Sequence, residues 1–176
     1  MTADNVNQIT ESFLETLASL GDSIHGLRGI PLLTALKREK LAHGPYPGVS
    51  LFEAANRIMS DLVILRGIAG LIRAGTFGID SYLVEFGNED HNGFDIRGKD
   101  HQGRTLVGEA FNVAPSFFGP KKQKAVSKLR SNGSAATYRL LLVNDDAVDT
   151  SYAPRAEPGF QYVFVNIESG AIRIVP

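Results

Sequence analysis

Two acidic residues, Asp95 and Glu109, stand among apolar neighbours in the short segments 93–97 and 107–111. A carboxylate in such surroundings is unfavourable unless it is solvated, paired or bound to a cation. If the two segments form adjacent strands, both carboxylates converge on a site of hard oxygen ligands that suits Mg²⁺ or Mn²⁺. Such an ion polarises a phosphodiester, lowers the pKa of a bound water and neutralises the leaving oxygen. The two residues therefore predict metal-dependent chemistry on phosphate esters.

Both acids also have structural interpretations. Asp95 follows a loop and could accept hydrogen bonds from the amides of that loop. Glu109 could form an ion pair with Arg97 or Arg104 across a hairpin. Glutamate is disfavoured in the middle of a strand, so Glu109 is the harder of the two to explain without a ligand.

Charge is distributed unevenly along the chain, although its formal net value is only -1. Residues 80–100 contain six acids and two bases, whereas residues 110–144 contain no acid. An acidic segment followed by a basic one fits a metal site beside a surface that binds a polyanion. A solvated helix face would carry the same charges. We assign to the nucleic-acid backbone five cations of the basic segment: Lys121, Lys122, Lys128, Arg130 and Arg139.

The elements that must position these residues follow from hydrophobic spacing and turn signals. Apolar residues at helical spacing predict helices over 6–20 and 31–42, followed by a Gly-Pro-Tyr-Pro-Gly turn at 44–48. Ser50 and Glu53 form a capping box that opens a helix over 51–73. Strands are predicted over 77–86, 94–99, 104–112 and 138–143, a helix over 121–130, and a closing hairpin over 161–167 and 171–175.

These elements predict one α/β domain with a mixed sheet over residues 1–176. It comprises a helical extension (1–49), an α-β-β-β-α-β core (50–144) and a C-terminal loop and hairpin (145–176). In this order, with Asp95 opening the second strand and Glu109 inside the third, the chain resembles the PD-(D/E)XK nucleases of restriction-endonuclease-like fold. The resemblance covers about residues 50–144. It implies hydrolysis of phosphodiester bonds in DNA, with Mg²⁺ or Mn²⁺ held by Asp95, Glu109 and Glu53. Glu53 could instead serve only the helix cap and an ion pair with Arg57.

One position departs from the pattern of this superfamily. Two residues after Glu109, where the resemblance calls for a lysine, the chain has Phe111. Some members supply that lysine from the following helix, so Lys121, Lys122 or Lys124 could replace it, and we predict Lys124. A domain without such a lysine would bind nucleic acid or a protein partner without cutting. An unrelated α+β fold with a small-molecule ligand is the third alternative.

Composition excludes other kinds of chemistry. The chain has no cysteine, hence no disulfide, no thiolate zinc site and no cysteine nucleophile. Phosphate-binding glycine loops and nucleophile elbows of known pattern are absent. The apolar segment 51–72 is interrupted by charged residues, which predicts a buried helix and no membrane partner. With no signal peptide recognisable, we expect a cytoplasmic protein, and a homodimer would suit an enzyme that cuts both strands.

Overall fold

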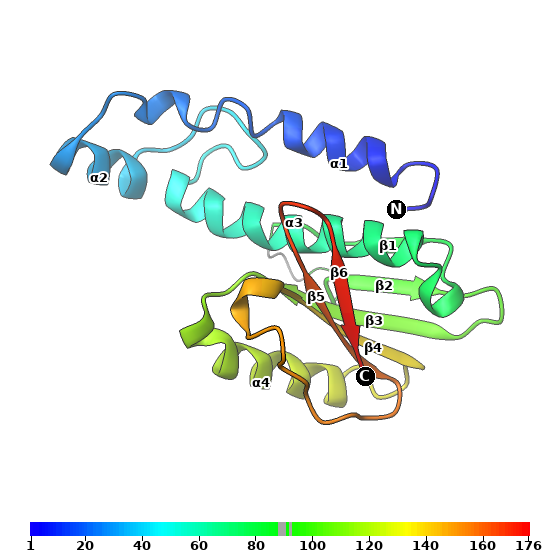
Figure 1. Cartoon of the computed structure of the whole chain (residues 1–176). Helices are drawn as coiled ribbons and strands as arrows, with labels where there is room; N and C mark the ends of the chain where they lie inside the picture. Colours follow the sequence, from blue (N-terminus) through cyan, green and yellow to red (C-terminus); the bar gives the residue numbers. More distant parts are fainter. Residues whose placement is uncertain (88–90, 92) are drawn as a thin grey trace.

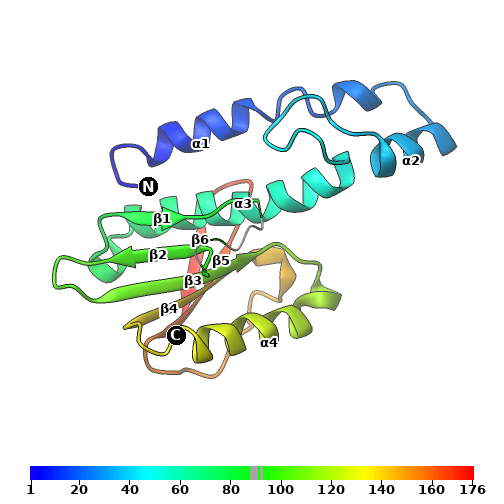
Figure 2. The ribbon, with the colours of Figure 1, turned by 180° about the vertical axis from the view of Figure 1, so that it is seen from behind.

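The computed structural model describes residues 1–87, 91 and 93–176. A six-stranded mixed sheet forms its centre, and the long helix α3 and the helix α4 cover opposite faces of the sheet (Figure 1). Helices α1 and α2 lie on the side of α3 that faces away from the sheet, as both views show (Figure 2). The described residues thus form a mixed α/β fold, which confirms the predicted fold class at this level.

The described part of the chain contains four α-helices and six strands in an order that matches the prediction. The helices are α1 (Val6–Glu15), α2 (Gly29–Arg38), α3 (Leu51–Arg73) and α4 (Pro115–Ser131). The strands are β1 (Tyr82–Val84), β2 (Ile96–Lys99), β3 (Thr105–Phe111), β4 (Tyr138–Asn144), β5 (Phe160–Val165) and β6 (Ile172–Val175). None of the described helices combines the length and the apolarity needed to cross a membrane.

The sheet follows the order of the sequence, from β1 at one edge to β6 at the other. Strands β1, β2 and β3 form an antiparallel meander, β3, β4 and β5 run parallel, and β6 returns antiparallel to β5. The register pairs Ile96 with Gly108 and Lys99 with Thr105. This register brings the start of β2 beside the second half of β3, where the predicted acids lie.

Helix α3 begins at the predicted cap and is buried on two sides. The Ser50 hydroxyl accepts a hydrogen bond from the Glu53 amide at 3.2 Å, but the Glu53 carboxylate turns to Arg57. Gly67 allows the helix to approach the sheet closely, because a Cβ there would lie 2.6 Å from Leu142. The long apolar helix therefore serves as a core layer between the sheet and the N-terminal helices.

Side chains along β3 alternate between two hydrophobic clusters. Leu106 and Ala110 pack in the cluster beneath α3, whereas Val107 and Phe111 pack in the cluster beneath α4. Successive residues of a strand point to opposite faces of the sheet. Glu109 therefore points to the α4 face, between Val107 and Phe111.

The prediction was wrong at several boundaries. Helix α4 begins at Pro115, six residues before the predicted start, and contains Pro120. Pro115 occupies the first helical position, where proline is well tolerated. Pro120 is the sixth residue and removes one helical hydrogen bond, but Gly119 has no Cβ to clash with its ring, so the Gly-Pro pair that indicated a break lies inside the helix. Strand β1 is shorter than predicted, because residues 76–78 form a helical turn in which Phe77 has a φ of 66°.

Candidate functional site

Asp95 lies where strands β2 and β3 separate. It directly precedes β2, and its Oδ2 accepts a hydrogen bond from the Ala110 amide at 2.7 Å. The last backbone pair of the two strands is Ile96 with Gly108. The carboxylate thus takes the place of the next carbonyl in the ladder. The backbone carbonyl of Asp95 accepts a hydrogen bond from the Glu85 amide at 2.9 Å, so the backbone of Asp95 is fixed on the β1 side as well.

A second acid, Asp61, approaches Asp95 from the middle of α3. Its exposed fraction is 1%. The Gly87 amide donates to its Oδ1 at 3.0 Å, and the hydroxyl of Tyr46, from the proline-rich turn, donates to its Oδ2. Burial, with a smaller contribution from the negative charge of Asp95, raises the pKa of Asp61 from 3.8 to about 6, against the lowering effect of these hydrogen bonds and of Arg57. The two carboxylates are therefore close enough to repel each other.

Glu109 lies one position beyond the last β2–β3 pair and is held by a lysine of α4. Its Oε1 is 2.9 Å from Lys128 Nζ, and the side chains are 12% and 29% exposed. The Lys128 ammonium also lies 5.6 Å from the centre of the Phe94 ring, next to Asp95 in the chain. Arg104, one of the two arginines suggested as a partner of Glu109, pairs with Asp100 at 2.6 Å.

Glu53 lies apart from these acids. It is exposed in the first turn of α3, where its carboxylate is 2.7 Å from Arg57. Asp61 follows eight residues later, which corresponds to about 12 Å along the helix axis. Of the acids of α3 named here, Asp61 is therefore the one that interacts with Asp95. Glu53 instead takes part in the helix cap and the ion pair with Arg57, the structural role considered as its alternative.

The predicted cations of α4 and β4 separate into different environments. Lys124 is exposed and lines a shallow depression with Lys128. The ammonium of Lys121 lies 5.9 Å from the centre of the Phe111 ring. The other three bridge to the loop that follows β4: Lys122 donates to Tyr152, and Arg130 and Arg139 both pair with Glu157.

Sequence reasoning missed Asp61 as a site residue and gave Lys128 a different role. A partial signal for Asp61 was available, because it lies within the long apolar helix 51–73, and a charged residue that is buried there needs partners. Its partners Tyr46 and Gly87 are distant in sequence, so their approach could not be read from spacing. Lys128 lies near the end of α4, beyond the lysines considered for the position of Phe111.

The donors gathered here are carboxylate oxygens, which are the ligands that Mg²⁺ and Mn²⁺ prefer. Within residues 1–87, 91 and 93–176, no group of three or more acidic or histidine side chains is arranged to hold a metal ion. Asp61 and Asp95 interact electrostatically, and a cation held by only two carboxylates would complete its shell with water, as Mg²⁺ commonly does.

Comparison with known proteins adds no relative: no protein-family model, no curated protein and no solved structure matched the chain.

Proposed function

We propose that the chain is a divalent-cation-dependent phosphodiesterase of the nuclease type, acting on nucleic acid. The observation that carries this proposal is that Asp61 and Asp95 both accept hydrogen bonds from the segment after β1, through the amides of Gly87 and Glu85. The ion pair of Glu109 with Lys128 lies on the neighbouring strand β3. The order α3-β1-β2-β3-α4-β4 supports it, because this order resembles the restriction-endonuclease-like core.

In this proposal Asp61 and Asp95 hold the cation, which polarises the phosphodiester and activates water when bound. Hydrogen bonds from Tyr46 and Gly87 orient the carboxylate of Asp61, and the Ala110 amide orients that of Asp95. Both acids are therefore fixed in place before any ligand arrives. Such preorganisation is what makes charged groups effective in a site.

Lys128 takes the role proposed earlier for Lys124. Phe111 packs in the core beneath α4 and offers no charge, whereas Lys128, from the following helix, carries its ammonium to Glu109. An ammonium at this position stabilises negative charge that develops on a phosphate oxygen. Glu109 keeps the lysine side chain extended toward the acids and acts as its positioning residue.

Titration calorimetry with Mn²⁺ tests the proposal. We expect heat of binding at one or two sites in the wild type, and none in the Asp95→Asn or Asp61→Asn variants. Glu53→Gln removes an acid from the same helix away from the site and is the matched control, with wild-type heat expected. Cleavage of labelled DNA in Mg²⁺ should be lost with the same two variants. Wild-type cleavage by Asp95→Asn would reject the assignment.

A second candidate is a module of the same fold that binds nucleic acid or a partner without catalysis. It is favoured by Phe111 at the lysine position and by a Glu109 that already has a cation beside it. For this candidate the wild type would give no Mn²⁺ heat and no cleavage, while binding of nucleic acid would be equal in EDTA and in Mg²⁺.

A further inference from the structure

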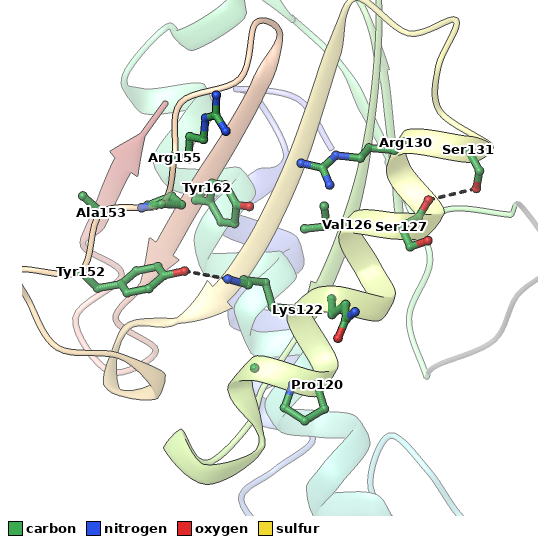
Figure 3. A pocket seen from close by; sticks show the side chains of 13 residues that line it. Pro120, Lys122, Val126, Ser127, Arg130, Ser131, Tyr152, Ala153, Arg155 and Tyr162 are labelled. Carbon is green, nitrogen blue, oxygen red and sulfur yellow. Dashed lines mark hydrogen bonds between the residues drawn. The ribbon is translucent and has the colours of Figure 1, made fainter.

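A groove of about 1210 Å³ lies between α4 and the loop 145–159 that follows β4 (Figure 3). Lys122 and Arg130 contribute to it from α4, and Arg155 from the loop. The rings of Tyr152 and Tyr162 lie between the helix and the loop in this view. The groove is separate from the acids described above, because Asp61, Asp95 and Glu109 are not among its lining residues.

The walls of the groove are held at a fixed spacing by two contacts. The Lys122 ammonium donates to the Tyr152 hydroxyl at 3.0 Å, and Arg130 pairs with Glu157 at 2.6 Å. The two α4 residues are eight positions apart, which is about 12 Å along the helix. Tyr152 is further fixed by an edge-to-face contact with Phe118 at 5.4 Å. The groove is therefore formed before a ligand binds.

The charge of the groove favours an anionic ligand. Its described lining residues include three cations and no aspartate or glutamate. The basic surface continues across α4, where Lys124 and Lys128 line a neighbouring depression that shares Gln123 and Ser127 with the groove. Lys128 and Arg130 are each paired with a glutamate, so the positive charge of this surface is carried chiefly by Lys122, Lys124 and Arg155. Cations spaced along one surface match a ligand with repeated negative charge.

A protein partner is less well matched, because protein interfaces depend on buried apolar and aromatic anchors. The large hydrophobic side chains that are exposed in the described chain all lie outside the groove: Ile30, Leu33, Phe52, Met59, Leu83 and Phe117. The groove offers cations, hydroxyl groups and tyrosine rings instead, a combination typical of surfaces that bind single-stranded nucleic acid.

We infer that the groove binds the phosphodiester backbone of a single strand of nucleic acid, with Arg155 and Lys122 contacting phosphates from opposite walls and no cation required. The walls touch through the Lys122–Tyr152 hydrogen bond, so a duplex cannot enter between them. A strand that leaves the groove across α4 reaches Lys128. This last step rests on the proposed function, whereas binding in the groove does not.

Fluorescence anisotropy of a labelled 15-nucleotide oligo-dT, measured in EDTA with the Asp95→Asn variant, tests the inference. We expect binding that weakens with salt, and weaker binding of a duplex of equal length. Arg155→Ala should remove about one phosphate contact, and with it about 0.7 from the slope of log K against log salt. Between 50 and 200 mM salt, the affinity of Arg155→Ala should therefore fall by a factor about 2.6 times smaller than that of the protein with Arg155.

Three further variants keep the test independent of folding. Gln123→Glu adds a negative charge to the groove wall on an exposed helix position, and should weaken binding several-fold. Gln8→Glu, on the exposed face of α1, makes the same change far from the groove and should have no effect, as should Arg28→Ala beside α2. Equal affinity of Arg155→Ala and Arg28→Ala would overturn the inference. So would a poly-glutamate peptide that binds where oligo-dT does not.

Failure of this inference can be told apart from failure of the proposed function. If oligo-dT binds in EDTA and responds to Arg155, but no cation-dependent cleavage occurs, only the proposed function falls. If the chain hydrolyses a small phosphodiester in Mg²⁺ through Asp61 and Asp95, but Arg155 and Gln123 variants bind oligo-dT like wild type, only the groove assignment falls.

Discussion

Replacing Asp61 with asparagine should stabilise the protein at alkaline pH. Asparagine has nearly the same shape, can accept from the Gly87 amide and can donate to the Tyr46 oxygen, so both contacts of Asp61 are retained in a neutral form. The substitution removes a negative charge on a residue that is 1% exposed and that the charge of Asp95 destabilises. A carboxylate that is shielded from water and near another carboxylate opposes folding.

The magnitude follows from the pKa of Asp61, which rises from 3.8 to about 6 on folding. A difference of about two pKa units corresponds to about 3 kcal/mol between the charged and the neutral form. The folded state binds a proton near pH 6 that the unfolded state binds only near 3.8, so wild-type stability should rise as the pH falls through 6 toward 4. Above pH 6 the wild type bears the full penalty, and the variant does not.

Chemical denaturation at pH 8 and pH 4.5 measures this difference. We expect Asp61→Asn to be more stable than wild type by up to about 3 kcal/mol at pH 8, and the gain to shrink by most of that amount at pH 4.5. Asp4→Asn, at an exposed position, is the control and should show no such pH dependence. A variant that is destabilised at pH 8, or that differs from wild type equally at both pH values, would refute the reasoning.

Three other predictions concern the cation, the Glu109 pair and the core. Mn²⁺ at 100 times its dissociation constant should raise the free energy of unfolding of the wild type by about 2.7 kcal/mol, an effect that EDTA reverses and Asp95→Asn abolishes in thermal unfolding. Lys128→Met should destabilise the protein and Glu109→Gln should relieve that loss, with a coupling energy of about 1 kcal/mol in a double-mutant cycle; additive effects would show that the pair does not interact. Gly67→Ala should destabilise by up to about 2 kcal/mol in denaturant titration, because its Cβ would lie 2.6 Å from Leu142 and overpacking outweighs the gain of about 1 kcal/mol in helix propensity. Gly21→Ala, which has open space around it, should be close to neutral, and an equal loss there would contradict the packing explanation.

The fold was predictable where local pattern and tertiary packing agree. Helix α3 starts at its Ser50 cap and ends at Arg73, as the sequence predicts, because its cap and its long apolar run both favour the same element. Strand β4 is likewise evident from its continuous apolar run, since it is covered on both faces. Helix α4 was predicted too short, because Pro120 indicates a helix break from local sequence alone. Packing of Phe118 and Leu129 in the core maintains the helix in spite of it.

The candidate site was predictable only in part. Asp95 and Glu109 were selected because carboxylates among apolar residues are conspicuous in any sequence. Glu53 was selected without considering Asp61, whose contact with the turn that carries Tyr46 is not revealed by any spacing rule. Lys124 was selected among Lys121, Lys122 and Lys124, and Lys128 was not considered for this role. Which lysine reaches Glu109 depends on where α4 begins and how it lies over β3, and both are set by tertiary packing.

A cation shared by Asp61 and Asp95 is the central element of the proposed function. A crystal soaked in Mn²⁺, with data collected at a wavelength where manganese scatters anomalously, locates such an ion directly. We expect one anomalous peak within about 2.0–2.6 Å of a carboxylate oxygen of each residue. A fully soaked crystal with no peak there, or with manganese bound only elsewhere on the surface, would contradict the account.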